Sequence, residues 1–298
     1  MGPKAFLATM ATAVVLLASD AGADTRLPIF DTHLHYSQSV WQAYPPQDVA
    51  KLLDEAGVAR ALVSSTPDDG SLMLHRADPG RFVPVLRPYR DAVTPTNWFN
   101  DPEVVGYLDE RLKAGAGSYV GIGEFHLFDV KYVATPQVKR VIEMAVERGI
   151  LLHVHSDAAV VRALFALNPK ARILWAHAGM SEPADVVGDM LDRYAALCTE
   201  VSYRAGDIAP GGKLAPAWRA VLIKHHDRFM IGTDTHSATR WETYPDIVNE
   251  HRRWLSQLPK DVAEAIAWRN AVRAFGAGGR QEFAGPRSTG SACVTPRS

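Results

Sequence analysis

Short runs of apolar and β-branched residues alternate along the chain with longer stretches in which apolar residues recur at helical spacing. The short runs predict strands, and the longer stretches predict amphipathic helices. The predicted strands span 29–35, 58–65, 81–87, 119–125, 150–156, 171–178, 197–203 and 229–235. The predicted helices span 47–56, 71–78, 101–114, 136–148, 157–167, 183–194, 214–226, 243–257 and 260–275.

The regular alternation of strands and helices predicts parallel strand pairing. Eight such units over about 250 residues indicate a closed barrel. We therefore expect an α/β fold, a single-domain (β/α)8 or TIM barrel, over residues 24–276. Residues 277–298 are rich in Gly, Ser and Pro and lack apolar periodicity, which predicts a disordered tail.

The chain begins with an apolar run that is typical of a secretory signal peptide. Lys4 precedes the run, and the small residues Ala21 and Ala23 lie near its end. We expect residues 1–23 to be removed and the mature protein to be periplasmic or secreted. The alternative is an uncleaved membrane anchor, but the run is shorter than the ~20 residues that a membrane span needs. No integral membrane segment is expected after cleavage.

The charge balance and the cysteine content narrow the class of protein. The formal net charge is −1, whereas a nucleic-acid partner requires a basic stripe, so none is expected. The two cysteines are Cys198, in a predicted strand, and Cys293, in the predicted tail. An export compartment would allow a disulfide between them, but we do not expect one, and no zinc-ribbon spacing occurs.

Ionisable side chains stand at the carboxyl ends of several predicted strands, where barrel enzymes carry their active sites. His33 and His35 lie one residue apart on the first strand and share a face, because strand side chains alternate in direction. The other four are Glu124, His155, His177 and Asp234.

Six such residues on one rim need a common partner, because burying an unpaired charge or imidazole is costly. A divalent cation supplies that partner. Imidazole and carboxylate ligands suit zinc, with manganese or iron as alternatives, and the lack of thiolates disfavours a purely structural site. Each residue alone has an ordinary explanation, such as a helix cap for Asp234. Their order on five strands predicts a metal centre.

The segments DTHLH, GIGEF, HVHS, WAHAG and IGTDTH resemble the successive strand motifs of the metal-dependent amidohydrolase superfamily. The resemblance is greatest to its branch of small barrel enzymes called amidohydrolase-related or amidohydrolase 2 proteins. It covers residues 29–275 and is specific for the superfamily, but it says little about the substrate.

The resemblance implies a role for each of the six residues. His33 and His35 would hold the more buried metal, and Asp234 would complete its ligands. His155 and His177 would hold a second metal if there is one. Glu124 stands where many members carry a bridging carboxylated lysine or a glutamate.

The number of ions stays open, one or two. In members with one metal, His155 is still a ligand and His177 instead polarises the substrate. His153 lies on the same strand face as His155, one layer deeper. We expect it to be a barrel-interior residue hydrogen-bonded below the site, with ligation in place of His155 as the alternative.

The chemistry that such a site supports is attack by activated water. A bound metal lowers the pKa of its water toward ~7. Asp234 would orient the water, accept its proton and pass that proton to the leaving group. The metal or His177 would stabilise the oxyanion. Asp31, on the same strand face as His33, is a candidate for holding an imidazole from outside the ligand set.

Substrate contacts are predicted from residues that follow the strands. Arg204, after the seventh strand, would suit a substrate carboxylate or phosphate, with a loop-anchoring role as the alternative. The same two alternatives, a substrate contact or a loop-anchoring role, apply to Arg87 and Arg90 after the third strand. His126 is expected to face the mouth, and Trp241 to wall a pocket or to pack.

The remaining histidines and Tyr244 are not assigned to the metal centre. Tyr244 is interpreted as a packing residue. The prediction for His236, two residues after Asp234, is undecided. We expect His75, His225 and His226 to lie on helix surfaces.

We predict a metal-dependent hydrolase that cleaves an amide, ester, lactone or phosphoester bond of a small molecule. The alternative is a metal-dependent decarboxylase of a small carboxylic acid, because related barrels use the same ligands. A non-enzymatic metal-binding or ligand-binding protein is a third reading, against which the intact Asp234 argues. Homo-oligomer formation is left open.

Overall fold

The computed structural model describes residues 26–115 and 117–276. The predicted leader 1–23, the predicted tail 277–298 and Cys293 lie outside this part of the chain. The strands are β1 (Ile29–His35), β2 (Val58–Ser64), β3 (Phe82–Val85), β4 (Gly121–His126), β5 (Leu151–His155), β6 (Ile173–Trp175), β7 (Leu197–Glu200) and β8 (Phe229–Met230).

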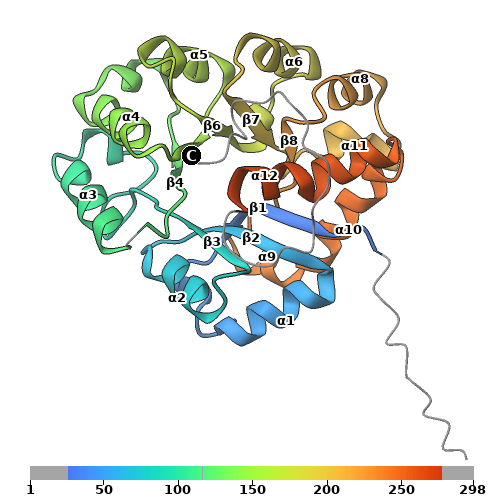
Figure 1. The fold of residues 1–298 in the computed structure, drawn as a ribbon, viewed down its shortest axis with the longest axis horizontal. Coiled ribbons are helices and arrows are strands. Elements are labelled where there is room, and N and C mark those ends of the chain that lie inside the picture. The colour runs from blue at the N-terminus through green and yellow to red at the C-terminus, as the bar shows by residue number, and fades with distance from the viewer. Residues whose placement is uncertain (1–25, 116, 277–298) are drawn as a thin grey trace, which may run out of the picture.

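The strands form a closed parallel barrel. Strands β1 to β3 pair in one sheet and β4 to β8 in another, each in chain order. Two isolated parallel bridges, Leu86 with Ile122 and Asp31 with Ile231, join the sheets at both seams. Helices surround the strands as an outer ring (Figure 1). The TIM-barrel prediction is confirmed.

The ring consists of α1 (Pro46–Ala56), α2 (Asp69–Ala77), α3 (Val104–Ala114), α4 (Pro136–Arg148), α5 (Ala158–Leu167), α6 (Ala184–Arg193), α8 (Pro216–Lys224) and α10 (Tyr244–Leu255). Each corresponds to a predicted helix. Local signals explain their ends: Thr135 Oγ1 accepts a hydrogen bond from Val138 N at the start of α4, and Gly149 at φ 62° ends it.

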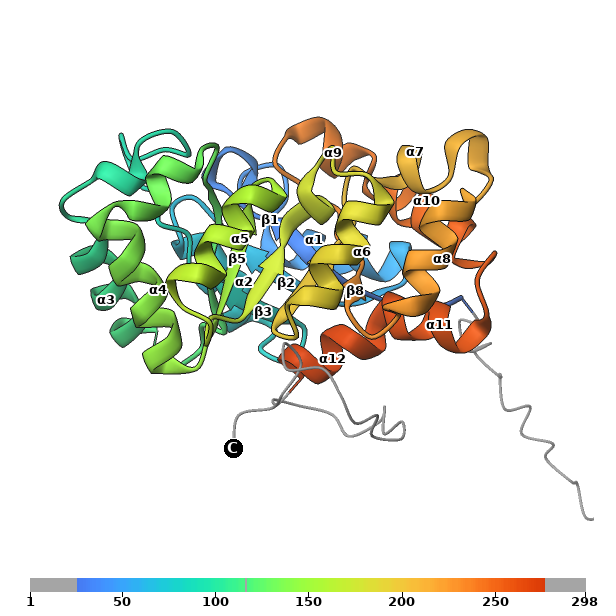
Figure 2. The same cartoon turned by 90° about the horizontal axis from the view of Figure 1, so that it is seen from above.

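The last predicted helix is composite. It comprises α11 (Lys260–Glu264), a π-helical turn (Ala265–Arg269) and α12 (Asn270–Phe275). Two short helices, α7 (Ala205–Ile208) and α9 (Ala238–Glu242), follow β7 and β8. In Figure 2, α7 and α9 lie at one end of the barrel and α12 at the other.

An apolar layer fills the amino end of the barrel. It contains side chains from seven strands, and Ala271 and Phe275 of α12 cover it. The strand members are Phe30, Leu62, Val83, Val85, Leu151, Leu174, Cys198 and Met230. Because side chains alternate along a strand, β5 continues from this layer through His153 to His155 at the carboxyl end. The polar residues therefore occupy the upper half of the barrel.

Several predicted details are wrong. Cys198 is disulfide-bonded, which corrects the expectation that it is unpaired; cysteines distant in sequence give no local signal of pairing. His225 is only 7% exposed, and its Nε2 lies 3.6 Å from Asp192 Oδ1 of α6. His75 is half-buried and its Nδ1 lies 2.8 Å from the carbonyl of Phe82. His226 is exposed as predicted.

Two strands are much shorter than predicted. The backbone leaves β6 before His177 and β8 before Asp234, and both residues adopt positive φ, 56° and 52°. Such conformations cost energy in residues other than glycine and occur often at functional sites. Within the described residues, no helix has the length and apolar character needed to cross a membrane.

Candidate metal centre

The first set of candidate ligands comes from opposite ends of the chain. The Nε2 atoms of His33 and His35 are 3.1 Å apart. Asp234 Oδ1 lies 3.0 Å from His35 Nε2 and 3.7 Å from His33 Nε2. All three side chains are buried. Ligand bonds of about 2.0–2.2 Å around one tetrahedral cation place ligand atoms at about such separations.

The second set comes from the other sheet. Glu124 Oε1 lies 2.8 Å from His155 Nδ1 and 3.5 Å from His177 Nε2, and these two nitrogens are 3.1 Å apart.

Glu124 faces both sets at once. Its second oxygen, Oε2, is 3.2 Å from His35 Nε2 and 3.4 Å from His33 Nε2. One carboxylate therefore presents one oxygen to each set, as a bridging ligand of two ions would.

The tautomer of His33 tests whether these residues fit a cation. Its Nδ1 lies 2.9 Å from the Glu200 carboxylate, which only accepts hydrogen bonds, so Nδ1 carries the proton. Burial alone would lower the pKa of His33, but the charges of Glu124, Asp234 and Glu200 hold it well above its usual value, so Nε2 also carries a proton until a cation replaces that proton. In the neutral ring that a cation would bind, Nε2 presents a lone pair to His35 Nε2 and to the Asp234 carboxylate. Lone pairs converging in a buried space repel unless a cation or a proton lies between them. The donor set therefore fits a divalent metal.

Glu200 is a residue of the site that we did not predict from the sequence. Its side chain is fully buried at the end of β7, below the ligands. It also accepts hydrogen bonds from His177 N at 2.6 Å and Ser202 N at 2.7 Å. A Cβ atom at Gly232 would overlap Glu200 Oε2, so the segment after β8 carries glycine there. The one available signal was a carboxylate inside the apolar run LCTEVSY.

Asp31 does not have the predicted role. Its carboxylate accepts hydrogen bonds from the backbone N–H of His33 and Thr233, and from the hydroxyls of Thr233 and Tyr244. It therefore joins β1 to the segment after β8, and within the described residues it makes no hydrogen bond to an imidazole. Glu200 takes the role that was expected of Asp31. Tyr244 is fully buried, which confirms its interpretation as a packing residue.

His153 lies below the site, as predicted. Its ring centroid is 4.5 Å from that of His33, and its Nε2 has no hydrogen-bond partner within the described residues. Burial, together with the His33 charge, holds the pKa of His153 well below its usual value. The predicted hydrogen bond of His153 below the site is therefore not made by Nε2 within this part of the chain.

Carboxylates dominate the electrostatics of the centre. Burial alone would raise the pKa of Glu124, but His126, His33 and the hydrogen bonds from His155 and His177 hold it well below the usual range. Burial would also raise the pKa of Asp234, but the charge of His33 outweighs this effect and holds the pKa well below its usual value. Both groups are charged at neutral pH and attract a cation.

Arg87 lies beside Glu124 and is itself buried. Its Nη2 donates to Glu124 Oε2 at 3.2 Å and its Nε to the Glu124 carbonyl at 3.1 Å. These contacts orient the candidate bridging carboxylate. The prediction that Arg87 binds substrate gains no support from them.

The Arg204 side chain hydrogen-bonds to the backbone around His177. Its Nη1 donates to the carbonyls of His177 and Ala178, and its Nη2 to the carbonyl of Glu182. Its Nε donates to Asp207. The side chain is 3% exposed. The predicted substrate contact is therefore replaced by the alternative, a loop-anchoring arginine.

Trp241 is packed rather than presented to a pocket. It is fully buried, and its ring stacks on Tyr44 with centroids 5.1 Å apart. The pocket-wall interpretation is therefore corrected.

His126 and His236 do lie at the mouth. The His126 ring stacks on His155 with centroids 4.2 Å apart, and its Nδ1 lies 2.8 Å from Tyr89 Oη. His236 Nδ1 lies 3.5 Å from Asp234 Oδ1. Binding of substrate by His126 stays a prediction.

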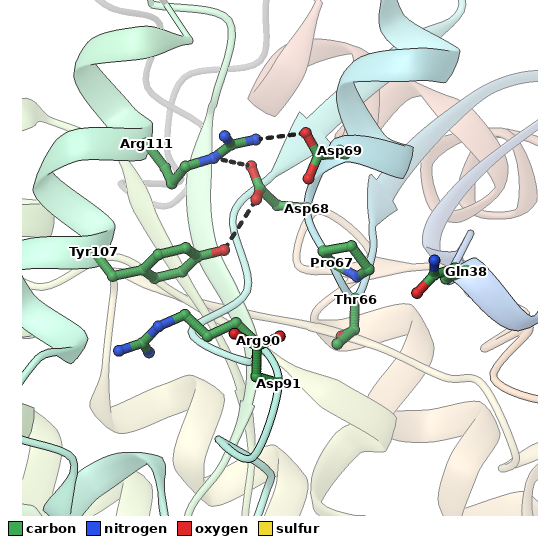
Figure 3. Close-up of a pocket in the computed structure, with 9 residues that line it drawn as sticks. All are labelled: Gln38, Thr66, Pro67, Asp68, Asp69, Arg90, Asp91, Tyr107 and Arg111. Carbon is green, nitrogen blue, oxygen red and sulfur yellow. Dashed lines mark hydrogen bonds and ion pairs between the residues drawn. The ribbon is translucent and has the colours of Figure 1, made fainter.

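A separate polar cavity of about 400 Å³ lies off the centre, among the loops after β1, β2 and β3 (Figure 3). Arg90 lines it but is paired with Asp101 at 2.8 Å. Asp68 is buried there and accepts from Tyr107 and Arg111. None of the candidate metal ligands lines this cavity.

Comparison with known proteins agrees with this fold. A probable 2-pyrone-4,6-dicarboxylic acid hydrolase from Acinetobacter baumannii, with bound citric acid, is 15% identical; the match covers 83% of this chain and 99% of that one, with a TM-score of 0.56. A TatD homologue from Escherichia coli is also 15% identical, over 84% and 98%, with a TM-score of 0.57.

A 5-carboxyvanillate decarboxylase from Novosphingobium aromaticivorans, complexed with manganese and 4-hydroxy-3-methoxy-5-nitrobenzoic acid, is 12% identical over 84% and 96%, with a TM-score of 0.52. No curated protein sequence matches this chain.

The barrel and its converging histidines and carboxylates define a TIM-barrel enzyme of the amidohydrolase superfamily. The amidohydrolase family model matches residues 30–277, so the chain belongs to that family.

Proposed function

We propose that this enzyme is a metal-dependent hydrolase that uses activated water to cleave an amide, ester, lactone or phosphoester bond of a small molecule. The observation that carries the proposal is the pair of ligand sets facing the two oxygens of Glu124, with Asp234 beside the first set. Zinc is the first choice of metal for this imidazole and carboxylate donor set, with manganese or iron as alternatives.

His33, His35 and Asp234 would hold one cation, and His155 and His177 a second, with Glu124 between them. A divalent cation there would supply Lewis-acid activation of water and of the scissile group.

The chain's own residues would handle the proton and orient the ligands. Asp234 is ionised at neutral pH and lies at the rim, so it can accept a proton from water at a carboxylate oxygen and return it to the leaving group. His177 Nδ1 lies 2.7 Å from Ser202 Oγ, which orients the ring. Its Nε2 then faces the space between the two sets, where it can act on the substrate oxygen if only one ion binds.

Decarboxylation of a small carboxylic acid is the second candidate, because one structural relative is a 5-carboxyvanillate decarboxylase. That reaction requires a site that holds a carboxylate. Arg87 and Arg204, the predicted carboxylate ligands, are instead bonded to protein groups. Hydrolysis is therefore the preferred proposal.

Metal analysis of the mature protein, followed by an activity screen, tests the proposal. The screen should include esters, lactones, amides, phosphoesters and aromatic acids. Asp234→Asn is expected to keep the fold and to lose at least 100-fold in turnover, because it cannot accept the proton. Less than a tenth of an ion per chain after repletion, or release of CO2 as the sole activity, would overturn the proposal.

We also propose that the protein is exported and that its mature form begins after Ala23. The support is the pattern of residues 1–23, which lie outside the described part of the chain. Intact mass of the protein from a periplasmic fraction tests this, and retention of the leader would contradict it.

A further inference from the structure

Exposed large apolar side chains gather at the mouth of the metal centre. Of the five in the described residues, Phe128 and Val130 follow β4, Met180 follows β6 and Tyr203 follows β7. Phe128 is the most exposed, at 58%. The fifth, Leu167, ends α5 at the opposite end of the barrel. This distribution is uneven, since carboxyl-end loops carry four of the five.

Two of these rings contact the metal-centre histidines directly. The centroid of Phe128 lies 5.4 Å from that of His126 and 6.2 Å from that of His155. The Tyr203 ring lies 5.9 Å from His177.

Met180 belongs to the same turn as His177, since its N–H donates to the His177 carbonyl. Phe128, Met180 and Tyr203, the apolar mouth, thus flank the second ligand set on both sides. Apolar groups exposed together at a site mark a binding surface.

Three arginines near the centre, Arg87, Arg204 and Arg240, make hydrogen bonds to protein groups. Arg87 and Arg204 are bonded as described above. Arg240 donates through Nε to the Asp234 carbonyl at 2.6 Å, and its guanidinium lies over the Tyr203 ring, 3.9 Å from the centroid. These contacts hold Arg240 beneath the apolar mouth, and the guanidinium in turn holds the Tyr203 ring in place.

We propose that the apolar mouth binds an uncharged aromatic or apolar group of the substrate, adjacent to the bond that is cleaved. The substrate class is then a neutral ester, lactone or amide with an apolar substituent, rather than an acid recognised through carboxylates. This inference rests on the proposed hydrolase function, because it places the apolar substituent next to a group held at the metal centre.

Small hydroxamic acids test the inference by binding alone, because hydroxamates chelate metals and carry a variable substituent. Titration calorimetry of the metal-loaded full-length protein is expected to give benzohydroxamate at least tenfold tighter binding than acetohydroxamate. A 4-carboxylate on the benzohydroxamate ring is expected to weaken binding. Phe128→Ala and Tyr203→Ala should each reduce at least threefold the ratio of benzohydroxamate affinity to acetohydroxamate affinity.

Leu167→Ala is the matched control, since it removes an exposed apolar side chain far from the centre, and it should keep the wild-type ratio. An unchanged ratio in both mouth variants, or tighter binding of the 4-carboxylate, would overturn the inference while leaving the metal centre intact. Failure of every hydroxamate to bind the metal-loaded protein would instead overturn the proposed function, and this inference with it.

Discussion

Glu200 is a buried charge that bonds to the ring of one candidate ligand, His33, and to the backbone N–H groups of His177 and Ser202. Its position below His33 fixes the proton on Nδ1 and leaves Nε2 free to bind a cation. Groups that orient ligand imidazoles in this way commonly contribute 10–100-fold to metal affinity.

We therefore expect Glu200→Gln to weaken metal binding by roughly 10-fold or more, since an uncharged amide is a poorer partner for the His33 N–H. The measurement is the dissociation constant from competition with a chromophoric chelator. The affinity measurement distinguishes orientation of the His33 ring from a general role in folding. If Glu200 only stabilised the fold, the variant would have a lower melting temperature, but its folded fraction would bind the metal with unchanged affinity.

Asp31→Asn is the matched control, because Asp31 is equally buried and bonds to the same β1 segment but, within the described residues, makes no hydrogen bond to an imidazole. The Asp31→Asn substitution should lower the free energy of unfolding by about 1–3 kcal/mol, since the hydroxyl and amide donors lose a charged acceptor. Metal affinity should stay within twofold of the wild type. Equal loss of affinity in both variants would contradict a specific role for Glu200.

Candidate ligands could be predicted from the sequence because each stands at a strand end in a short local motif. His33, His35 and Asp234 converge as the motifs implied. Glu200 and the contacts of Arg204 could not be predicted, because both depend on which backbone groups of other strands lie opposite. A side chain's rim position is visible in the sequence, but its partner across the barrel is not.

At the scale of elements, the turn that carries His177 is restrained by Arg204, in addition to the hydrogen bond from His177 N to Glu200. The 3-10 turn η4 (Ala176–Gly179) places His177 and Ala178 at positive φ. A residue other than glycine keeps such a conformation only where its surroundings enforce it. The guanidinium of Arg204 bonds three carbonyls of residues 177–182 and so provides that restraint.

Arg204→Lys should loosen this turn, because one ammonium cannot replace the forked donors that reach several carbonyls. We expect faster hydrogen exchange in residues 176–182 and weaker binding of a second metal ion. Arg228→Lys is the control, since Arg228 bonds the carbonyls of Tyr194 and Leu197 away from the centre. Unchanged exchange in residues 176–182 would show that other contacts hold the turn.

Helix α10 is joined to the segment after β8 through His251. Its Nε2 donates to the Gly232 carbonyl at 3.0 Å, and its Nδ1 accepts from Trp254 Nε1 at 3.2 Å. The ring is therefore neutral, and burial lowers the pKa of His251 to about 4. In the unfolded chain a histidine titrates near 6.5.

This difference predicts a loss of stability in acid. Below pH 6.5 His251 is protonated in the unfolded chain, whereas in the folded protein it stays neutral until the pH falls to about 4. The contribution, of the order of 3 kcal/mol, is therefore present above pH 6.5 and is lost as the pH falls toward 4.

Urea titrations of the wild type and His251→Gln, both in chelator, measure this effect. The variant should be less stable at pH 7, and the gap should narrow toward pH 4. A gap that stays constant would refute the titration of His251.

Element boundaries show where sequence reasoning is weakest. The existence and order of all eight strands follow from alternation of apolar runs and amphipathic stretches. The ladders of β6 and β8 end at Trp175 and Met230, before the positive-φ residues His177 and Asp234. Apolar periodicity reports burial, which continues past the end of the ladder, and therefore it overestimates strand length.

For the whole molecule, the metal centre spans both sheets of the barrel. At each seam the sheets are joined by one isolated bridge and a few backbone hydrogen bonds. His33 and His35 come from the first sheet, whereas Glu124 and His155 come from the second. A cation that bonds residues of both sheets would hold the barrel closed at its carboxyl end, and an unfolded chain offers no such site. Metal binding is therefore coupled to global stability.

Removal of the metal should consequently lower the melting temperature. At 100 times the dissociation constant one ion adds about 2.7 kcal/mol, which corresponds to roughly 5–10 °C for a domain of this size. Calorimetry of the chelated and zinc-repleted protein measures the shift. His35→Asn should abolish most of it, because the first ligand set loses an imidazole, whereas Glu250→Gln on the exposed face of α10 should retain it. If chelated and repleted protein melt at the same temperature, no cation connects the two sheets.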